Sequence, residues 1–199
     1  TFDELAEAIA YSYNNHDKVI IPAFAVGRTQ EILYCLYLLR QKGQLPHDMP
    51  IFVDSPLAIR ATEVFKDFKD YLDTPEIDLT ENMSTLLPNL KFTLSAVESQ
   101  ALNVMKGPAI IISASGMCNA GRIQHHLRHN AWRPTASIVF VGYQGVGTPG
   151  RKIVDGASSI RLFNEDIAIK AKVFTIGGFS AHAGQSQILD WMRKMTHPG

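Results

Sequence analysis

The chain has 199 residues, and its 19 lysines and arginines equal its 19 aspartates and glutamates, so the formal net charge is +0. Hydrophobic residues make up 46% and charged residues 19%, which excludes a disordered tail, a collagen-like chain and a coiled coil. No apolar stretch reaches about 18 residues, so we expect no membrane span. The two cysteines, Cys35 and Cys118, are too few for a disulfide scaffold and favour the reducing cytoplasm.

The balanced total hides an uneven distribution of charge along the chain. Residues 1–105 carry 8 basic and 15 acidic side chains, a net charge of −7, and residues 106–199 carry 11 basic and 4 acidic ones, a net charge of +7. If the basic side chains of the second half share one surface, that surface attracts a polyanion. The alternative is that halves of a sequence are not halves of a fold.

Helical patterns alternate with short, β-branched runs along most of the chain. Apolar residues at helical spacing predict helices at 3–15, 29–42, 58–73, 96–106, 119–131 and 185–195, with a short one from 151. The β-branched runs predict strands at 18–24, 50–56, 90–95, 109–115 and 137–143. The acidic, turn-rich residues 73–90 are interpreted as an excursion or a small helical segment.

The alternation of strands with helices of ten or more residues predicts βαβ units and a parallel sheet with helices on both faces. The polar loops that follow the strands then meet at one edge of the sheet, where ligands bind in such folds. The alternating residues 160–176, with a turn at Asn164–Asp166, predict a β-hairpin instead.

Glycines gather after the strand that ends near residue 143, at Gly142, Gly145 and Gly147. Their order does not match the dinucleotide fingerprint, and no Lys-Ser/Thr pair follows as in a phosphate-binding P-loop. A nucleotide cofactor is therefore disfavoured, and the two remaining interpretations are a backbone cradle for phosphate and a tight turn.

Three further features have both a functional and a structural interpretation. His125 and His129 are four residues apart, which is metal-ligand spacing on a helix, but without a third ligand we favour an exposed helix face. Asp54 is either a functional carboxylate or part of a helix cap, the commoner role. His182 lies in a Gly/Ser/Ala-rich turn and is suited to general-acid chemistry, although a lone histidine is more often structural.

Five segments, taken together and in order, resemble the β-CASP branch of the metallo-β-lactamase superfamily, which includes ribonuclease J and the endonuclease subunit of pre-mRNA 3′-end cleavage. They are IIPAFAVGRTQEIL (20–33), IFVDSPLA (51–58), IIISASGMCNAGRIQHHL (110–127), IVFVGYQGVGTPGRKI (138–153) and VFTIGGFSAHAGQSQILDW (173–191). The resemblance implies an α/β fold with a Rossmann-like parallel sheet, the β-CASP domain, over residues 1–160. Residues 161–199 would be an incomplete return into the metallo-β-lactamase core.

The same resemblance implies a role in RNA processing or degradation, with single-stranded RNA held between the two domains over two zinc ions. It makes FSAHAG the family's motif B and His182 the residue that helps the leaving group depart. The family's zinc motif, its motif A acid and its motif C histidine are not found in this sequence, so no residue here is expected to bind metal. We therefore expect the intact parent to be a metal-dependent ribonuclease, and this polypeptide, which begins at Thr1, to be an inactive part of it.

The predicted contacts with RNA come from residues near the strand-to-helix turns. Three arginines each follow a glycine there, where a phosphate would be met; the alternative for each is a helix-surface arginine. The predicted set is Arg28, Arg122, Arg151, Ser115, Gly116 and Ser180.

Two other functions compete with RNA hydrolysis. The first is a non-catalytic interaction module of an RNA-processing complex, and the second, disfavoured by the lack of a cofactor fingerprint, is a small-molecule enzyme. The expected partners are RNA and the missing metallo-β-lactamase core, without a membrane. The oligomeric state is open, with a homodimer among the alternatives.

Overall fold

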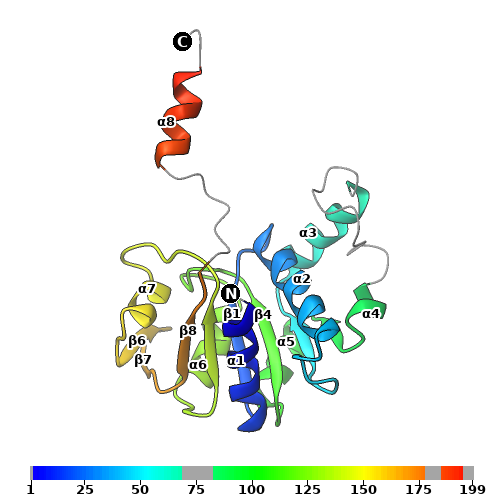
Figure 1. The fold of residues 1–199 in the computed structure, drawn as a ribbon. Helices are drawn as coiled ribbons and strands as arrows, with labels where there is room; N and C mark the ends of the chain where they lie inside the picture. The colour runs from blue at the N-terminus through cyan, green and yellow to red at the C-terminus, as the bar shows by residue number, and fades with distance from the viewer. Residues whose placement is uncertain (1, 69–82, 178–184, 195–199) are drawn as a thin grey trace.

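Six parallel strands form the central sheet of the protein in a computed structural model that describes residues 2–68, 83–177 and 185–194 (Figure 1). The order of the strands is β3-β2-β4-β1-β5-β8. Their bounds are Lys18–Pro22 for β1, Ile51–Val53 for β2, Leu90–Phe92 for β3, Ala109–Ser113 for β4, Ser137–Phe140 for β5 and Lys172–Thr175 for β8. The predicted α/β fold with a parallel sheet is therefore confirmed.

Every residue of β1, β2, β4 and β5 is buried, as the continuous β-branched runs predict for strands covered on both faces. Alternate side chains then belong to two separate hydrophobic cores: Val19 and Ile21 of β1 pack on one side of the sheet, and Ile20 packs on the other. The sheet is thus the partition between two helical layers.

One face of the sheet is covered by α1 (Phe2–Asn14), α2 (Arg28–Gln41) and α3 (Pro56–Asp67). The other face is covered by α5 (Ala96–Val104), α6 (Ile123–Asn130) and α7 (Pro149–Val154). The short α4 spans Met83–Leu86 within the predicted excursion, whose residues 73–82 lie outside the described residues, and α8 spans Gln185–Arg193 without a buried side chain.

The predicted hairpin is confirmed as β6 (Ser159–Leu162) paired with β7 (Glu165–Ala168) in a separate antiparallel sheet. Its turn is Phe163–Asn164, one residue earlier than predicted, and both residues have positive φ angles of 50° and 63°. That pattern matches the twist of a two-residue hairpin loop. After the hairpin, β8 pairs with β5 and extends the main sheet, while the division of the chain at residue 160 stays a prediction.

The helix predicted at 119–131 begins later, at Ile123. Residues 115–121 form a turn instead, because the Ser115 hydroxyl accepts from the backbone N–H of Ala120 and Gly121 has a φ of +81°. The polar side chains of this segment form hydrogen bonds within the loop, which compete with the backbone hydrogen bonds of a helical turn.

Candidate functional site

The loops that follow the parallel strands meet at one edge of the sheet, the upper edge in Figure 1. The chain leaves β1 toward α2 on one face and leaves β5 toward α7 on the opposite face, although β1 and β5 are neighbours. Loops that diverge in this way from adjacent strands open a crevice, the usual place for a ligand in such sheets.

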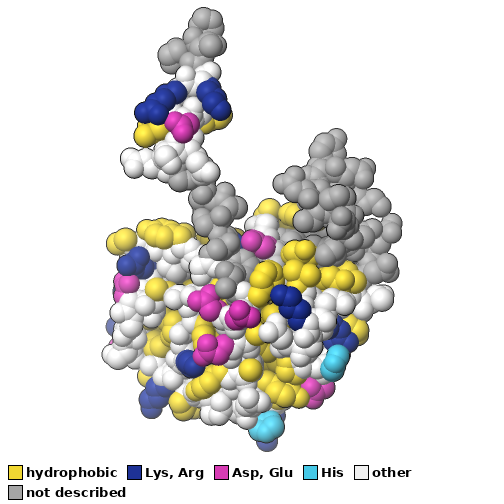
Figure 2. Space-filling view, viewed as in Figure 1, with side chains coloured by type: hydrophobic (Ala, Val, Ile, Leu, Met, Phe, Trp, Pro, Cys, Tyr) yellow, Lys and Arg dark blue, Asp and Glu magenta, His cyan; other side chains and the backbone are white. Residues whose placement is uncertain are grey.

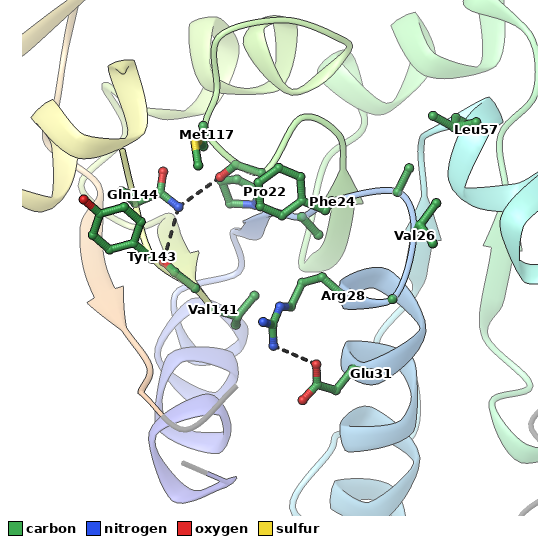
Figure 3. A pocket seen from close by; sticks show the side chains of 15 residues that line it. Pro22, Phe24, Val26, Arg28, Glu31, Leu57, Met117, Val141, Tyr143 and Gln144 are labelled. Atoms are coloured by element: carbon green, nitrogen blue, oxygen red, sulfur yellow. Dashed lines mark hydrogen bonds and ion pairs between the residues drawn. The ribbon is translucent and has the colours of Figure 1, made fainter. Parts of the chain in front are cut away.

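A pocket of about 720 Å³ occupies this crevice. Its walls come from residues 22–28, which run from the end of β1 to the start of α2, from Gly116 and Met117 after β4, and from residues 141–144 after β5 (Figure 3). Most lining side chains are apolar, and Arg28, Glu31 and Gln144 add the charged and amide groups. This volume and composition are typical of a site that binds a small organic group.

Arg28 lines the pocket from the first turn of α2, where Gly27 precedes it with a φ of 78°. Its side chain is 12% exposed, and NH1 donates to Glu31 Oε2 at 2.7 Å (Figure 3). Burial raises the pKa of the Glu31 carboxyl, and the Arg28 guanidinium opposes this shift. The pocket therefore contains an ion pair rather than an isolated positive charge.

The β4 loop, residues 114–122, brings two other predicted RNA contacts to the same edge. Gly116 lies so close to the Phe24 ring that an added Cβ would be 3.0 Å from it, so the absence of a side chain lets this ring pack against the loop. Ser115 donates to Asn119 Oδ1 at 2.8 Å and stabilises the loop. Gly116 is thus at the pocket, while the hydroxyl of Ser115 is used within the turn.

The predicted contact Arg122 is bound to other parts of the chain. Its NH1 donates to Asp54 Oδ1 at 2.7 Å and to the Thr93 carbonyl at 3.1 Å, and its NH2 donates to the Leu94 carbonyl at 2.8 Å. Arg122 therefore connects the ends of β2 and β3 to the start of α6. A contact of Arg122 with RNA stays a prediction.

Asp54 is the centre of a buried hydrogen-bond network that we call the Asp54 hub. Its fully buried carboxylate accepts from Arg122, from Thr93 Oγ1 at 2.5 Å, from Ser99 Oγ at 2.6 Å and from His126 Nε2 at 2.6 Å. Burial raises the pKa of this carboxyl, but the bonds from His126, Ser99 and Thr93 outweigh it and hold the pKa well below the ordinary value. The neighbouring Ser55 supplies the helix cap of α3.

His126 joins the hub from α6, with Nδ1 3.0 Å from Asn103 Oδ1 of α5. The two histidines with metal-ligand spacing, His125 and His129, are exposed, which confirms the predicted exposed helix face. Sequence reasoning missed His126, although its spacing from the buried Ile123 and Asn130 places it on the inner face of the same helix.

Arg151 lies in the first turn of α7, after the glycine-rich loop. Thr148 caps this helix by accepting from the backbone N–H of Arg151 at 3.2 Å, and Gly147 has a φ of +86°. A tight turn therefore accounts for Gly147, whereas Gly142 and Gly145 do not have a positive φ, and the phosphate cradle stays a prediction. The Arg151 Nε donates to the Asp155 carboxylate at 2.8 Å, and this hydrogen bond raises the pKa of the guanidinium.

The remaining predicted site residues, Ser180 and His182, lie outside the described residues. Within the described ranges, no group of three or more His, Cys, Asp or Glu side chains could hold a metal ion. The Asp54 hub does not fit one either, because its carboxylate already accepts four hydrogen bonds and the cationic Arg122 lies against it.

On the face seen in Figure 2, lysines and arginines are scattered, several acidic side chains lie together over the start of α1, and hydrophobic side chains gather around α2. The +7 of the second half of the chain is therefore not a continuous basic surface on that face. No helix in the described part of the chain is long and apolar enough to cross a membrane.

Comparisons with known proteins match almost the whole chain. The family described as Beta-Casp domain matches residues 29–153, and the Zn-dependent metallo-hydrolase RNA specificity domain matches residues 166–198. The chain is 37% identical over 195 residues to Ribonuclease TTHA0252 of Thermus thermophilus, covering 97% of this chain and 44% of that protein.

Two further relatives come from other organisms. An RNase J-like protein of Methanocaldococcus jannaschii is 35% identical over 195 residues, with 98% of this chain and 44% of the relative covered. Transcription termination factor FttA of Thermococcus kodakarensis is 33% identical over 199 residues, with 96% and 30% covered. The chain thus spans less than half the length of these relatives.

Proposed function

Because the chain belongs to the Beta-Casp domain family of the metallo-β-lactamase superfamily, we propose that it is the RNA-clamping part of a zinc-dependent RNA hydrolase. The observation that carries the proposal is the crevice between the β1 and β5 loops, where a pocket, an arginine and exposed aromatic side chains share the edge expected to hold a ligand. The similarity to a ribonuclease and to an RNase J-like protein supports RNA as the ligand.

In this proposal the chain binds and orients RNA, and the bound zinc supplies the chemistry that activates water and stabilises charge on the phosphate. The metal ligands would lie outside the described residues, since the described carboxylates and histidines do not form a suitable group. His182 would donate a proton to the leaving oxygen, and Ser180 would contact the RNA beside it. The reaction would take place in the cytoplasm, where the free, buried Cys35 and Cys118 stay reduced.

Arg151 offers the sharpest test of RNA binding, because its partner Asp155 provides a matched control. In the full-length protein, Arg151→Ala removes a positive charge and should weaken single-stranded RNA binding, reducing the slope of log affinity against log salt by about 0.7. Asp155→Ala breaks the same ion pair but leaves the positive charge, so it should keep or increase affinity. Fluorescence anisotropy across a salt series measures both.

Equal weakening by the two variants would assign the effect to α7 stability instead. Unchanged affinity and slope for Arg151→Ala would remove Arg151 from the RNA interface. If the full-length protein bound RNA but showed no chelator-sensitive cleavage, the non-catalytic interaction module would replace the hydrolase. A fall in cleavage with His182→Ala, at unchanged RNA affinity, is the outcome expected of a catalytic acid.

A further inference from the structure

We propose that the pocket between the β1 and β5 loops receives one unstacked nucleobase of the bound RNA strand. The inference rests on the proposed RNA-clamping function and adds the chemical group that the pocket recognises. A single-stranded RNA presents unpaired bases, and proteins commonly hold such bases by stacking them on aromatic side chains and bonding their edges. The pocket has both kinds of group.

Two aromatic rings lie at the pocket on separate loops. Phe24 comes from the β1 loop and Tyr143 from the β5 loop (Figure 3), and they are 44% and 67% exposed. Such exposure of aromatic rings leaves ring surface open for a flat ligand. The Phe24 ring is supported from behind by Gly116, where an added Cβ would approach it to 3.0 Å. At least this ring is therefore held in place before a base arrives.

Gln144 fixes the β5 loop, which carries Tyr143, to the β4 loop, against which Phe24 packs. Its Nε2 donates to the Gly116 carbonyl at 3.0 Å and to the Gly142 carbonyl at 3.3 Å, so one buried amide ties the β4 loop to the β5 loop (Figure 3). A pocket braced in this way loses little conformational freedom on binding, which favours affinity.

The polar groups of the pocket suit a base better than a phosphate. The Arg28 guanidinium is already paired with the Glu31 carboxylate, and a phosphate entering here would meet that negative charge. A base edge instead offers both acceptors and donors, which match a guanidinium and a carboxylate side by side. The phosphates would then remain outside, toward the neighbouring loops.

A binding assay with single abasic substitutions tests the inference on the full-length protein. In a series of single-stranded RNAs that each lack one base, one position should weaken binding by about 5- to 100-fold, the range for loss of one stacked base. Tyr143→Ala should weaken binding of the intact RNA and make that position insensitive to base removal, while Tyr143→Phe restores it. Because Tyr143 is exposed, its replacement should leave the fold intact.

Trp132→Ala serves as the matched control, since Trp132 is also an exposed aromatic residue, 52% exposed, but precedes β5 at the opposite edge of the sheet. The Trp132→Ala protein should bind the series of abasic RNAs as the unaltered protein does, with weaker binding at the same single position. A flat profile in a protein that binds RNA overturns the base pocket and leaves RNA clamping standing. Absence of RNA binding overturns the proposed function itself. Equal losses for Tyr143→Ala on intact and abasic RNA also overturn the base pocket.

Discussion

Replacement of Asp54 by alanine should be among the most destabilising single changes at the carboxyl edge of the sheet. The substitution leaves Arg122 and the buried side chains of His126, Ser99 and Thr93 without their common acceptor. Removal of one partner from a buried charged network costs about 3–5 kcal/mol, because the remaining groups stay buried and unpaired. For a domain of this size each kcal/mol lowers the melting temperature by about 2–4 °C.

The exposed pair Arg151–Asp155 provides the control, since both side chains are more than one third exposed. Asp155→Ala should cost no more than about 1 kcal/mol, the usual limit for a surface ion pair. Thermal unfolding gives the global difference, and hydrogen exchange of peptides from 51–58 and 96–130 shows whether protection is lost around the hub. If Asp54→Ala lowered stability no more than Asp155→Ala, the hub would not be a stabilising network.

Because of the Asp54 carboxyl, we also expect the stability of the folded protein to depend on pH. The pKa of the Asp54 carboxyl is lower in the folded protein than in the unfolded chain, where it has the ordinary aspartate value of about 4. Below about pH 4 the unfolded chain therefore binds more protons at Asp54 than the folded protein does. The stabilisation is therefore complete above that range and is lost as the pH falls through the folded pKa. The stability difference between the native protein and Asp54→Ala should shrink below about pH 4; a constant difference from pH 7 to pH 3 would contradict this.

Two further predictions concern the glycines and the cysteines. Gly121→Ala should lower the free energy of unfolding by about 2–5 kcal/mol, because the added Cβ would collide with the Ala114 carbonyl and the residue has a φ of +81°. Gly147→Ala has a similar φ but open space around the added Cβ, so it should lower the free energy of unfolding by only about 1–2 kcal/mol. Equal losses for the two variants in denaturant unfolding would refute the steric argument. Burial raises the pKa of both the Cys35 and Cys118 thiols to about 12, so neither should react with iodoacetamide at pH 8 until the protein unfolds; peptide mapping that finds rapid native alkylation at either cysteine would contradict it.

The sheet was predictable from the sequence because its signal is local. Residues 109–112 of β4, for example, are apolar without interruption, as expected of a strand covered on both faces. The hairpin and the exposed His125 and His129 follow from equally short patterns of turn residues and helical spacing. In each case the deciding residues lie within about ten positions of one another.

The Asp54 hub was not predictable in this way, because its members come from four separate segments of the chain. Asp54 and Arg122 are 68 positions apart and meet only because β2 pairs with β4. Without that pairing, Asp54 suggests a helix cap and Arg122, after a glycine, suggests a phosphate contact. Whether a polar side chain faces a ligand or another side chain depends on strand order, which a local pattern does not contain.

The β4 loop connects the hub to the base pocket, so the two sites are not independent. At one end of the loop Arg122 is bound to Asp54, and in its middle Gly116 supports the Phe24 ring and accepts from Gln144. The next residue, Met117, accepts from the backbone N–H of Gly150 in α7. Because the fully buried Cys118 also anchors this loop, loss of the Asp54 bond should loosen mainly the Arg122 end of the loop. The hub is thus joined to one wall of the pocket through the β4 loop, although Asp54 itself lies outside the pocket lining.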